Sequence, residues 1–169
     1  MPVRARTLLL ALAAAIAAAP AHAQPVPAAP APAGEFTPGS GGWLTYRNGS
    51  FGFHIDFPPA LLTPVERLAG DAGMRFAGPS ANLEVFTFPD AGGNDPAPLR
   101  AALRRLADVT YTAAGNSWVV ASGYAGSRVF YEKYFFSMGR IVGFRLTFET
   151  AQRPIFGPVV ERMEDSFGP

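Results

Sequence analysis

Alternating apolar and polar residues run through most of this 169-residue chain, and they predict a protein built largely from β-strands. The alternation is strict over residues 51–57, where the apolar side chains face one side while His54 and Asp56 face the other. Residues 141–148 repeat the pattern, with Arg145 on the polar side. Strands of this kind are typical of a sheet with one buried face.

Further strand patterns are separated by short turn signals, as expected for antiparallel hairpins. Asn48-Gly49 can adopt positive φ at little cost, and Met138-Gly139-Arg140 marks a second turn. The further strands are predicted at residues 43–46, 73–77, 82–88, 109–112, 118–122 and 127–136.

Two segments show helical spacing instead. Asp95 and Pro96 predict a helix start, as N-cap and first helical residue, and the apolar stripe that follows ends near Asp108. A last helix is predicted after Pro154, and one helical turn is expected around Pro64. The order strands, helix, strands, helix predicts an α+β fold, an antiparallel β-sheet with helices packed on it.

Residues 1–23 have the three parts of a secretory signal peptide. Two arginines precede an apolar run over residues 7–19, and small residues before Gln24 match a signal-peptidase site, so cleavage is predicted between Ala23 and Gln24. An uncleaved anchor is the competing interpretation, but the run is shorter than the roughly 20 residues that span a bilayer. No stable membrane insertion is therefore expected after cleavage. The high content of Ala, Arg, Pro and Gly is typical of a GC-rich bacterium, so the expected location is the periplasm or the cell exterior.

Residues 24–42 contain five prolines and four glycines, with Phe36 as the single large apolar side chain. Such a segment buries too little surface to offset the entropy of ordering it, so residues 24–42 are predicted to be an extended linker. Residues 43–169 then form a single α+β domain, with enough aromatic side chains for one packed core.

Charge and cysteine content exclude several classes of function. The chain carries 14 basic and 13 acidic residues, so there is no basic excess for nucleic acid or anionic lipid. Cysteine is absent, which excludes disulfides, thiolate metal sites and cysteine nucleophiles. The sequence has no phosphate loop, dinucleotide fingerprint or nucleophile elbow, so neither a cofactor nor a metal is expected.

Several segments together resemble the PsbP-like superfamily. The strongest is Tyr46-Arg47-Asn48 followed by residues 51–58, which is similar to the opening Y-x-N-x-x-(Y/F)-G-F-x-(I/F)-x-(Y/F)-P of that group. The resemblance implies an α-β-α sandwich around an antiparallel sheet. It also implies an accessory or partner-binding protein, since the group has no common catalytic apparatus. Shorter similarities lie at Asn82-Leu83-Glu84-Val85, residues 118–123, Phe130-Tyr131-Glu132-Lys133 and residues 159–167.

Two groups of residues are candidates for a functional site. His54 and Asp56 lie two residues apart on one strand face, roughly 6–7 Å from each other, so they suit two metal ligands or a base with its orienting acid. The alternative is that they are the polar side of an amphipathic strand. Tyr131 and Tyr134, on a strand with aromatics on both faces, and Arg145 are candidates for binding a partner or ligand.

The sequence favours an exported, non-enzymatic accessory domain that docks a protein partner in the cell envelope. This hypothesis predicts a contiguous exposed patch of Tyr, Phe and Arg side chains. Two alternatives remain open. One is a carrier for a small apolar ligand, with a cavity lined by Leu103, Phe144, Val160 and Met163, and the other is a small enzyme centred on His54. The sequence does not fix the oligomeric state.

Overall fold

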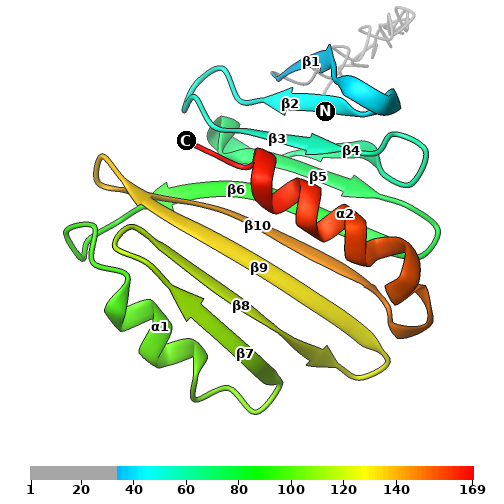
Figure 1. Ribbon diagram of the computed structural model, residues 1–169. Coiled ribbons are helices and arrows are strands. Elements are labelled where there is room, and N and C mark those ends of the chain that lie inside the picture. The colour runs from blue at the N-terminus through cyan, green and yellow to red at the C-terminus, as the bar shows by residue number, and fades with distance from the viewer. Residues whose placement is uncertain (1–33) are drawn as a thin grey trace, which may run out of the picture.

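A computed structural model describes residues 34–169, which form two antiparallel sheets and two α-helices (Figure 1). The strands are β1 (Glu35–Pro38), β2 (Leu44–Arg47), β3 (His54–Phe57), β4 (Thr63–Arg67), β5 (Gly73–Ala77), β6 (Ala81–Pro89), β7 (Val109–Ala114), β8 (Trp118–Ala125), β9 (Arg128–Ser137) and β10 (Arg140–Glu149). The helices are α1 (Ala97–Leu103) and α2 (Arg153–Ser166), with short 3-10 turns η1 (Ser40–Gly42), η2 (Ala69–Asp71) and η3 (Thr150–Gln152).

The small sheet has the order β1-β2-β3, and the large sheet has the order β4-β5-β6-β10-β9-β8-β7. Every pair of neighbouring strands is antiparallel. The predicted α+β class, an antiparallel sheet with helices packed on it, is therefore confirmed. Neither helix in this part of the chain is long and apolar enough to cross a bilayer.

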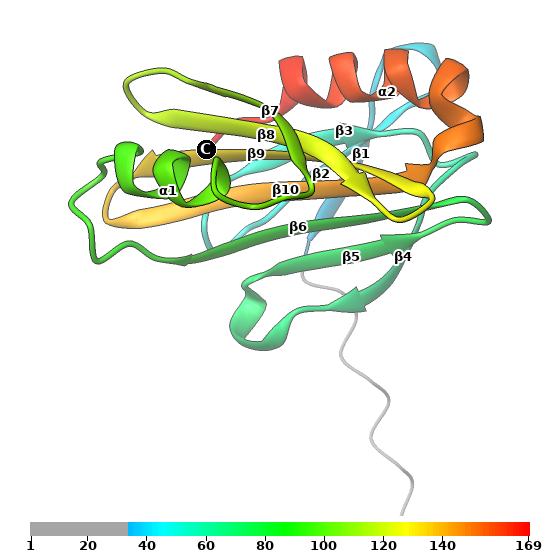
Figure 2. The same cartoon turned by 90° about the horizontal axis from the view of Figure 1, so that it is seen from below.

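The two sheets enclose one aromatic core. The small sheet and α2 cover one face of the large sheet, and α1 packs against the opposite face (Figures 1 and 2). Between the sheets the rings of Phe57 and Phe76 have centroids 4.7 Å apart, and under α2 the rings of Phe144 and Phe167 are 5.0 Å apart. Each such ring buries roughly 150–250 Å², so this layer is the main source of folding free energy.

The alternation predicted for residues 51–57 is confirmed. Phe53, Ile55 and Phe57 are fully buried in the core, whereas His54 and Asp56 on the other side of the strand remain partly exposed. The period of two therefore predicts correctly which side chains of this segment are inside.

The folded part begins earlier than the sequence predicts. The sequence places residues 34–42 in the linker, but β1 pairs with β2 along its whole length. The ring of Phe36 lies 5.6 Å from that of Tyr46 and packs against the core. The partial burial of Phe36 and the strand hydrogen bonds to β2 are sufficient to order this segment. The amino-acid composition of the segment predicts neither of these contacts. The predicted signal peptide and residues 24–33 lie outside the described residues.

Two further local predictions are wrong. The segment around Pro64 is the edge strand β4, not a helical turn, since an edge position and a bulge in the pairing with β5 tolerate proline. Helix α1 ends at Leu103 rather than near Asp108. Asp95 does not occupy the N-cap, although its carboxylate accepts a hydrogen bond from the N–H of Ala97 at 2.9 Å.

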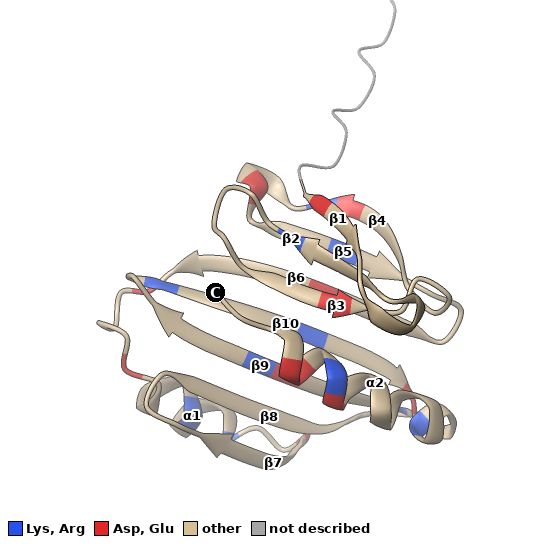
Figure 3. Ribbon diagram, turned by 45° about the horizontal axis from the view of Figure 1, so that its top comes forward, with Lys and Arg blue, Asp and Glu red and all other residues tan. Residues whose placement is uncertain are grey.

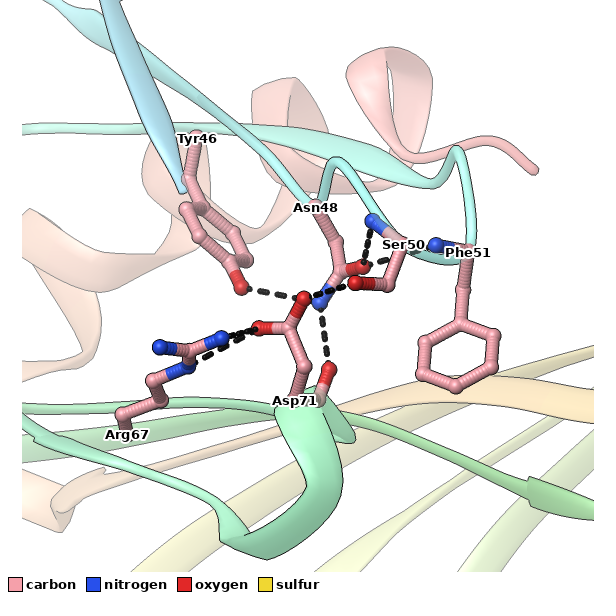
Figure 4. Close-up of polar contacts among 6 residues, drawn as sticks. All are labelled: Tyr46, Asn48, Ser50, Phe51, Arg67 and Asp71. Carbon is pink, nitrogen blue, oxygen red and sulfur yellow. Dashed lines mark hydrogen bonds and ion pairs between the residues drawn. The ribbon is translucent and has the colours of Figure 1, made fainter. Parts of the chain in front are cut away.

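A buried asparagine joins the small sheet to the large one (Figure 4). The side chain of Asn48 is fully buried. Its Nδ2 donates to the Tyr46 hydroxyl at 3.2 Å and to the backbone carbonyl of Asp71 at 2.8 Å. Its Oδ1 accepts from the backbone N–H groups of Ser50 and Phe51, at 3.0 and 2.9 Å. The amide therefore uses all of its hydrogen-bonding capacity.

Asp71 extends this network to β4. One carboxylate oxygen accepts from Arg67 Nε at 3.0 Å and pairs with Arg67 Nη2 at 3.0 Å, while the other accepts from the Ser50 hydroxyl (Figure 4). The turn after β2 is thus tied to the turn between β4 and β5. The Tyr46-x-Asn48 pattern, which carries the family resemblance, has a structural role.

Replacing Asn48 with alanine should lower the free energy of unfolding by about 2–4 kcal/mol, because a hydroxyl, a carbonyl and two N–H groups lose their buried partners. The measurement is urea denaturation followed by circular dichroism. Asn82→Ala is the matched control, since Asn82 is exposed on β6, and its effect should stay within about 0.5 kcal/mol. Equal effects of the two variants would contradict the role assigned to Asn48.

Candidate functional site

The five residues that the sequence singles out lie in three separate places. His54 and Asp56 lie on β3 beside α2. Tyr131 lies under α2, whereas Tyr134 and Arg145 lie together on the opposite face of the large sheet. The two tyrosines separate because they are three residues apart on one strand, and side chains alternate between faces.

Asp56 holds α2 against β3. Its carboxylate accepts a hydrogen bond from the Thr45 hydroxyl at 2.6 Å and pairs with Nη2 of Arg162 at 3.0 Å. Its backbone N–H donates to the Ser166 hydroxyl at 2.9 Å. The Arg162 guanidinium also stacks on the Trp43 ring, 4.4 Å from the centroid. The Asp56 carboxylate is therefore a structural anchor, already neutralised by an arginine.

His54 lies beside the C-terminal end of the chain. Its backbone exchanges two hydrogen bonds with Gly168, at 2.9 and 3.2 Å, and its Nδ1 is buried without a partner. Burial lowers the pKa of His54, the positive charge of Arg47 lowers it further, and Asp56 opposes both effects. Asp56 already bonds to Arg162, so its carboxylate is not available to orient His54 as a base. No group of three metal-ligating side chains is present among the described residues.

Tyr131 belongs to the covered face. Its hydroxyl donates to Oε2 of Glu164 on α2 at 2.6 Å. Lys133 Nζ donates to the carbonyl oxygen of Glu164 at 3.0 Å and lies 3.4 Å from its Oε1. Burial and the bond to Glu164 raise the pKa of Tyr131, so the hydroxyl remains a donor. Tyr131 therefore fastens α2 to β9.

Glu132 brings Tyr134 and Arg145 together on the opposite face. Its side chain is only 7% exposed. Its carboxylate accepts from the Tyr134 hydroxyl at 2.7 Å and pairs with Nε of Arg145 at 3.1 Å. Burial and the neighbouring carboxylate raise the pKa of Tyr134, which keeps this hydroxyl protonated. The Arg145 guanidinium also lies over the ring of Phe130, 5.3 Å from its centroid. The buried charge thus has the two donors that it needs.

A row of charged side chains crosses the same face. Strand register places Glu66, Arg75, Glu84, Arg145 and Glu132 side by side on β4, β5, β6, β10 and β9. Arg75 pairs with Glu66 at 2.7 Å and with Glu84 at 3.0 Å. Figure 3 shows the alternating charges on β5, β6 and β10. Exposed pairs contribute only about 0.2–1 kcal/mol each, so this charged row is more important as a surface pattern than for stability.

A row of aromatic side chains lies next to the charged row. Phe86 on β6 and Tyr134 on β9 lean over Gly143 of β10, with ring centroids 6.0 Å apart. Phe88 stacks on Phe86, also at 6.0 Å, and is 41% exposed. A Cβ on Gly143 would lie 2.8 Å from Phe86 and 3.0 Å from Tyr134. Only glycine therefore lets the two rings close over the central strand.

Most of both rows lies beyond the part of the sheet that α1 covers, and Tyr134 lies at the border, where it packs against the cluster of Leu103 and Val119. Helix α1 packs through Leu103 onto Val119 of β8. A hollow of about 300 Å³ opens along the charged row, with Val65, Arg75 and Arg145 among its lining residues. This surface is called the open face from here on. It comprises Glu66, Arg75, Glu84, Glu132, Arg145, Phe86, Phe88 and Tyr134.

The cavity expected for a ligand carrier does not form between the predicted residues. Leu103 of α1 packs on one side of the large sheet, whereas Phe144 of β10 and Met163 of α2 are fully buried on the other side. Because the two helices pack on opposite faces, Leu103, Phe144, Val160 and Met163 do not line one cavity.

Several residues of the open face are not predicted as site residues from the sequence. Glu84 and Phe86 become neighbours of Arg145 and Tyr134 only through the pairing of β6 with β10, which are far apart along the chain, whereas Glu132 faces Arg145 across the β9–β10 hairpin. One signal was present, since a glycine inside the strand pattern of residues 141–148 indicates a close approach of other groups.

Replacing Gly143 with alanine should lower the free energy of unfolding by about 1–3 kcal/mol, since the added methyl group forces Phe86 and Tyr134 apart. The measurement is again urea denaturation. Gly49→Ala is the control, because a Cβ there meets nothing within 4 Å, and its effect should stay within about 0.5 kcal/mol. A neutral Gly143→Ala variant would show that the aromatic pair moves aside freely.

His54 should make stability depend on pH. Its pKa is lower in the folded protein than the 6.5 of an exposed histidine, so protonation favours the unfolded chain. The contribution of neutral His54 to the free energy of unfolding is complete above about pH 6.5 and decreases as the pH falls through the pKa of His54 in the folded protein. Melting temperatures of the wild type and His54→Gln, measured from pH 8 to pH 5, should converge towards low pH. Parallel curves would contradict this assignment.

No protein-family model matches this sequence, and no curated protein matches it either. The solved structures that are similar to the described fold include the following two. The solution structure of cyanobacterial PsbP from Synechocystis sp. PCC 6803 has a TM-score of 0.56 at 12% identity, covering 77% of this chain and 94% of that one. The crystal structure of the Saccharomyces cerevisiae Ran-binding protein Mog1p has a TM-score of 0.50 at 8% identity, covering 75% and 94%. At these identities the similarity establishes architecture alone: the chain has the PsbP-like fold.

Proposed function

We propose that this chain is an exported, non-enzymatic accessory domain that binds a protein partner of the cell envelope through its open face. The proposal is carried by the contiguous set of Phe86, Phe88, Tyr134 and Arg145, which begins at the border of α1 and extends over the sheet surface beyond it. Aromatic and arginine side chains are enriched at protein interfaces and carry most of their binding energy. The exposed members Phe88 and Arg145, with the half-buried Phe86 and Tyr134 beside them, support the proposal of a docking patch.

Arg145 is the side chain best placed to select the partner. Glu132 holds its Nε, and the ring of Phe130 supports the guanidinium plane. Its remaining N–H groups make no hydrogen bond within the described part of the chain, and the side chain is 48% exposed. A guanidinium held in this way suits a carboxylate, which accepts two parallel hydrogen bonds. The partner is therefore expected to present an acidic side chain opposite Arg145 and an apolar one against Phe88.

The open face is rigid before any partner arrives. Its side chains stand on paired strands, and Tyr134 and Arg145 are both held by the buried Glu132. Binding then loses little side-chain entropy, which favours affinity. A standard interface covers about 800 Å² per partner, or a patch about 30 Å across. That size would also include Val65, which is 61% exposed beside the charged row.

The fold and the N-terminal sequence give the proposal its context. One similar solved structure is described as a Ran-binding protein, which is a precedent for protein binding by this fold. A signal peptide over residues 1–23, cleaved between Ala23 and Gln24, would deliver the domain to the periplasm or the cell exterior. The partner is therefore sought among envelope proteins.

The test is affinity capture from an envelope extract, with the tagged wild-type protein and the Phe88→Glu and Arg145→Glu variants compared by quantitative mass spectrometry. A genuine partner should be captured by the wild type and reduced at least tenfold in both variants. The reason is that each substitution places a negative charge against the acidic or apolar part of the partner's surface.

Ile155→Glu provides the matched control. Ile155 is 50% exposed on α2, so the variant introduces the same charge at a similarly exposed apolar position far from the open face. Capture should be unchanged in this variant. A partner lost equally from all three variants, or none captured by the wild type, would contradict the proposal. Circular dichroism confirms that each variant is folded.

A further inference from the structure

Strand β7 is the least protected sheet edge in the described part of the chain. It ends the large sheet beyond β8 (Figure 1). The other outer strands carry features that discourage pairing: β4 has a proline, two charged residues and a bulge, and β1 has a proline and a glutamate. The free edge of β3 is already occupied, since His54 bridges to Gly168 and the Asp56 N–H donates to Ser166. Strand β7 has the sequence Val-Thr-Tyr-Thr-Ala-Ala, without charge or proline, and its one irregularity lies at its start, between Val109 and Tyr111.

The outward backbone groups of β7 can be identified from its register. Gly115 N–H donates to the Trp118 carbonyl at 3.0 Å, so this position pairs with β8 through hydrogen bonds. Bonded and non-bonded positions alternate in an antiparallel ladder. Thr112 and Ala114 therefore direct their N–H and C=O groups away from β8. No hydrogen bond from another element reaches these groups within residues 34–169.

A positively charged groove lies beside this edge. It has a volume of about 310 Å³ and is lined by Arg104, which follows α1, and by residues 109–112 of β7. Arg104 and Arg105 are exposed, and neither forms an ion pair among the described residues. The Nε of Arg100, one turn earlier, is buried without a hydrogen-bond partner. The groove thus lies between the outward backbone groups of β7 and the guanidinium of Arg104, which has no ion-pair partner among the described residues.

We propose that β7 accepts an extended segment of another polypeptide as an additional strand, and that this segment carries an acidic side chain that pairs with Arg104. The N–H and C=O groups of Thr112 and Ala114 bind the main chain of the segment, as in other cases of strand addition. Arg104 supplies the preference for acidic sequences. This surface lies at the sheet edge, apart from the open face, so it is a second interaction site.

The test uses a yeast-displayed library of random ten-residue peptides. The library is selected for binding to the purified protein in its exported form, without the predicted signal peptide. Enriched peptides should alternate β-branched with polar residues and contain at least one Asp or Glu. A synthetic copy of the best peptide, labelled with fluorescein, is then titrated by fluorescence anisotropy. Arg104→Glu should weaken its binding at least tenfold, whereas Arg105→Glu, the control beside the groove, should change it less than threefold.

Two further measurements test the backbone contact. Thr112→Pro removes an outward N–H that the fold does not use, so the domain should stay folded while peptide binding is lost. A peptide methylated at alternate backbone nitrogens should also fail to bind, and this control leaves the protein unchanged. Phe88→Glu should bind the peptide like the wild type, which separates this site from the open face.

Three outcomes would overturn the proposal. The first is a selection that enriches no peptide. The second is an enriched peptide that binds wild type, Arg104→Glu and Thr112→Pro equally well. The third is a concentration-dependent dimer of the protein that Thr112→Pro abolishes, since β7 would then pair with a second copy of this chain.

Discussion

The structure depends on the closure of one aromatic layer between the small sheet and the large sheet. Rings from both sheets meet there, as Phe57 and Phe76 do at 4.7 Å, and α2 extends the layer through Phe167. Asn48 and Asp56 keep this layer closed from its two sides, one by bonding to the turn before β5 and the other by bonding to α2. Asn48 and Asp56 are thus used to position the covering elements.

The same closure determines the character of the opposite face. Side chains alternate along β9 and β10, so every residue that faces the core leaves its neighbour facing outwards. Tyr131 and Tyr134 are separated in this way, the first committed to Glu164 and the second to Glu132. Because strands β4, β5, β6, β10 and β9 pair in register, charges of alternating sign meet in one row instead of scattering over the surface. The open face is a consequence of register.

Local patterns predicted local structure well. The alternation over residues 51–57, the last helix near Pro154 and the turn at Met138-Gly139, where both residues have positive φ, all depend on interactions within a few residues. The wrong predictions concern segments whose structure is determined by contacts with residues far away in the sequence. Strand β1 is ordered by pairing with β2, and β4 accepts Pro64 because it is an edge. The pairing of Glu132 with Arg145 also depends on register, so the sequence identified Arg145 but not the group that positions it.

The size of α1 explains why this face, rather than the other, is available for binding. A helix of seven residues is about 10 Å long and about 10 Å wide. Seven strands at about 4.8 Å spacing extend over roughly 29 Å, so α1 can cover only about a third of that width. The opposite face receives α2, with 14 residues, and the whole small sheet. Helix α1 packs on β7 and β8 at one edge of the sheet, so Arg104, which follows it, lies near the β7 edge and most of the charged row lies beyond the helix (Figure 1). The position of a short α1 at this edge thus leaves room for both proposed binding surfaces.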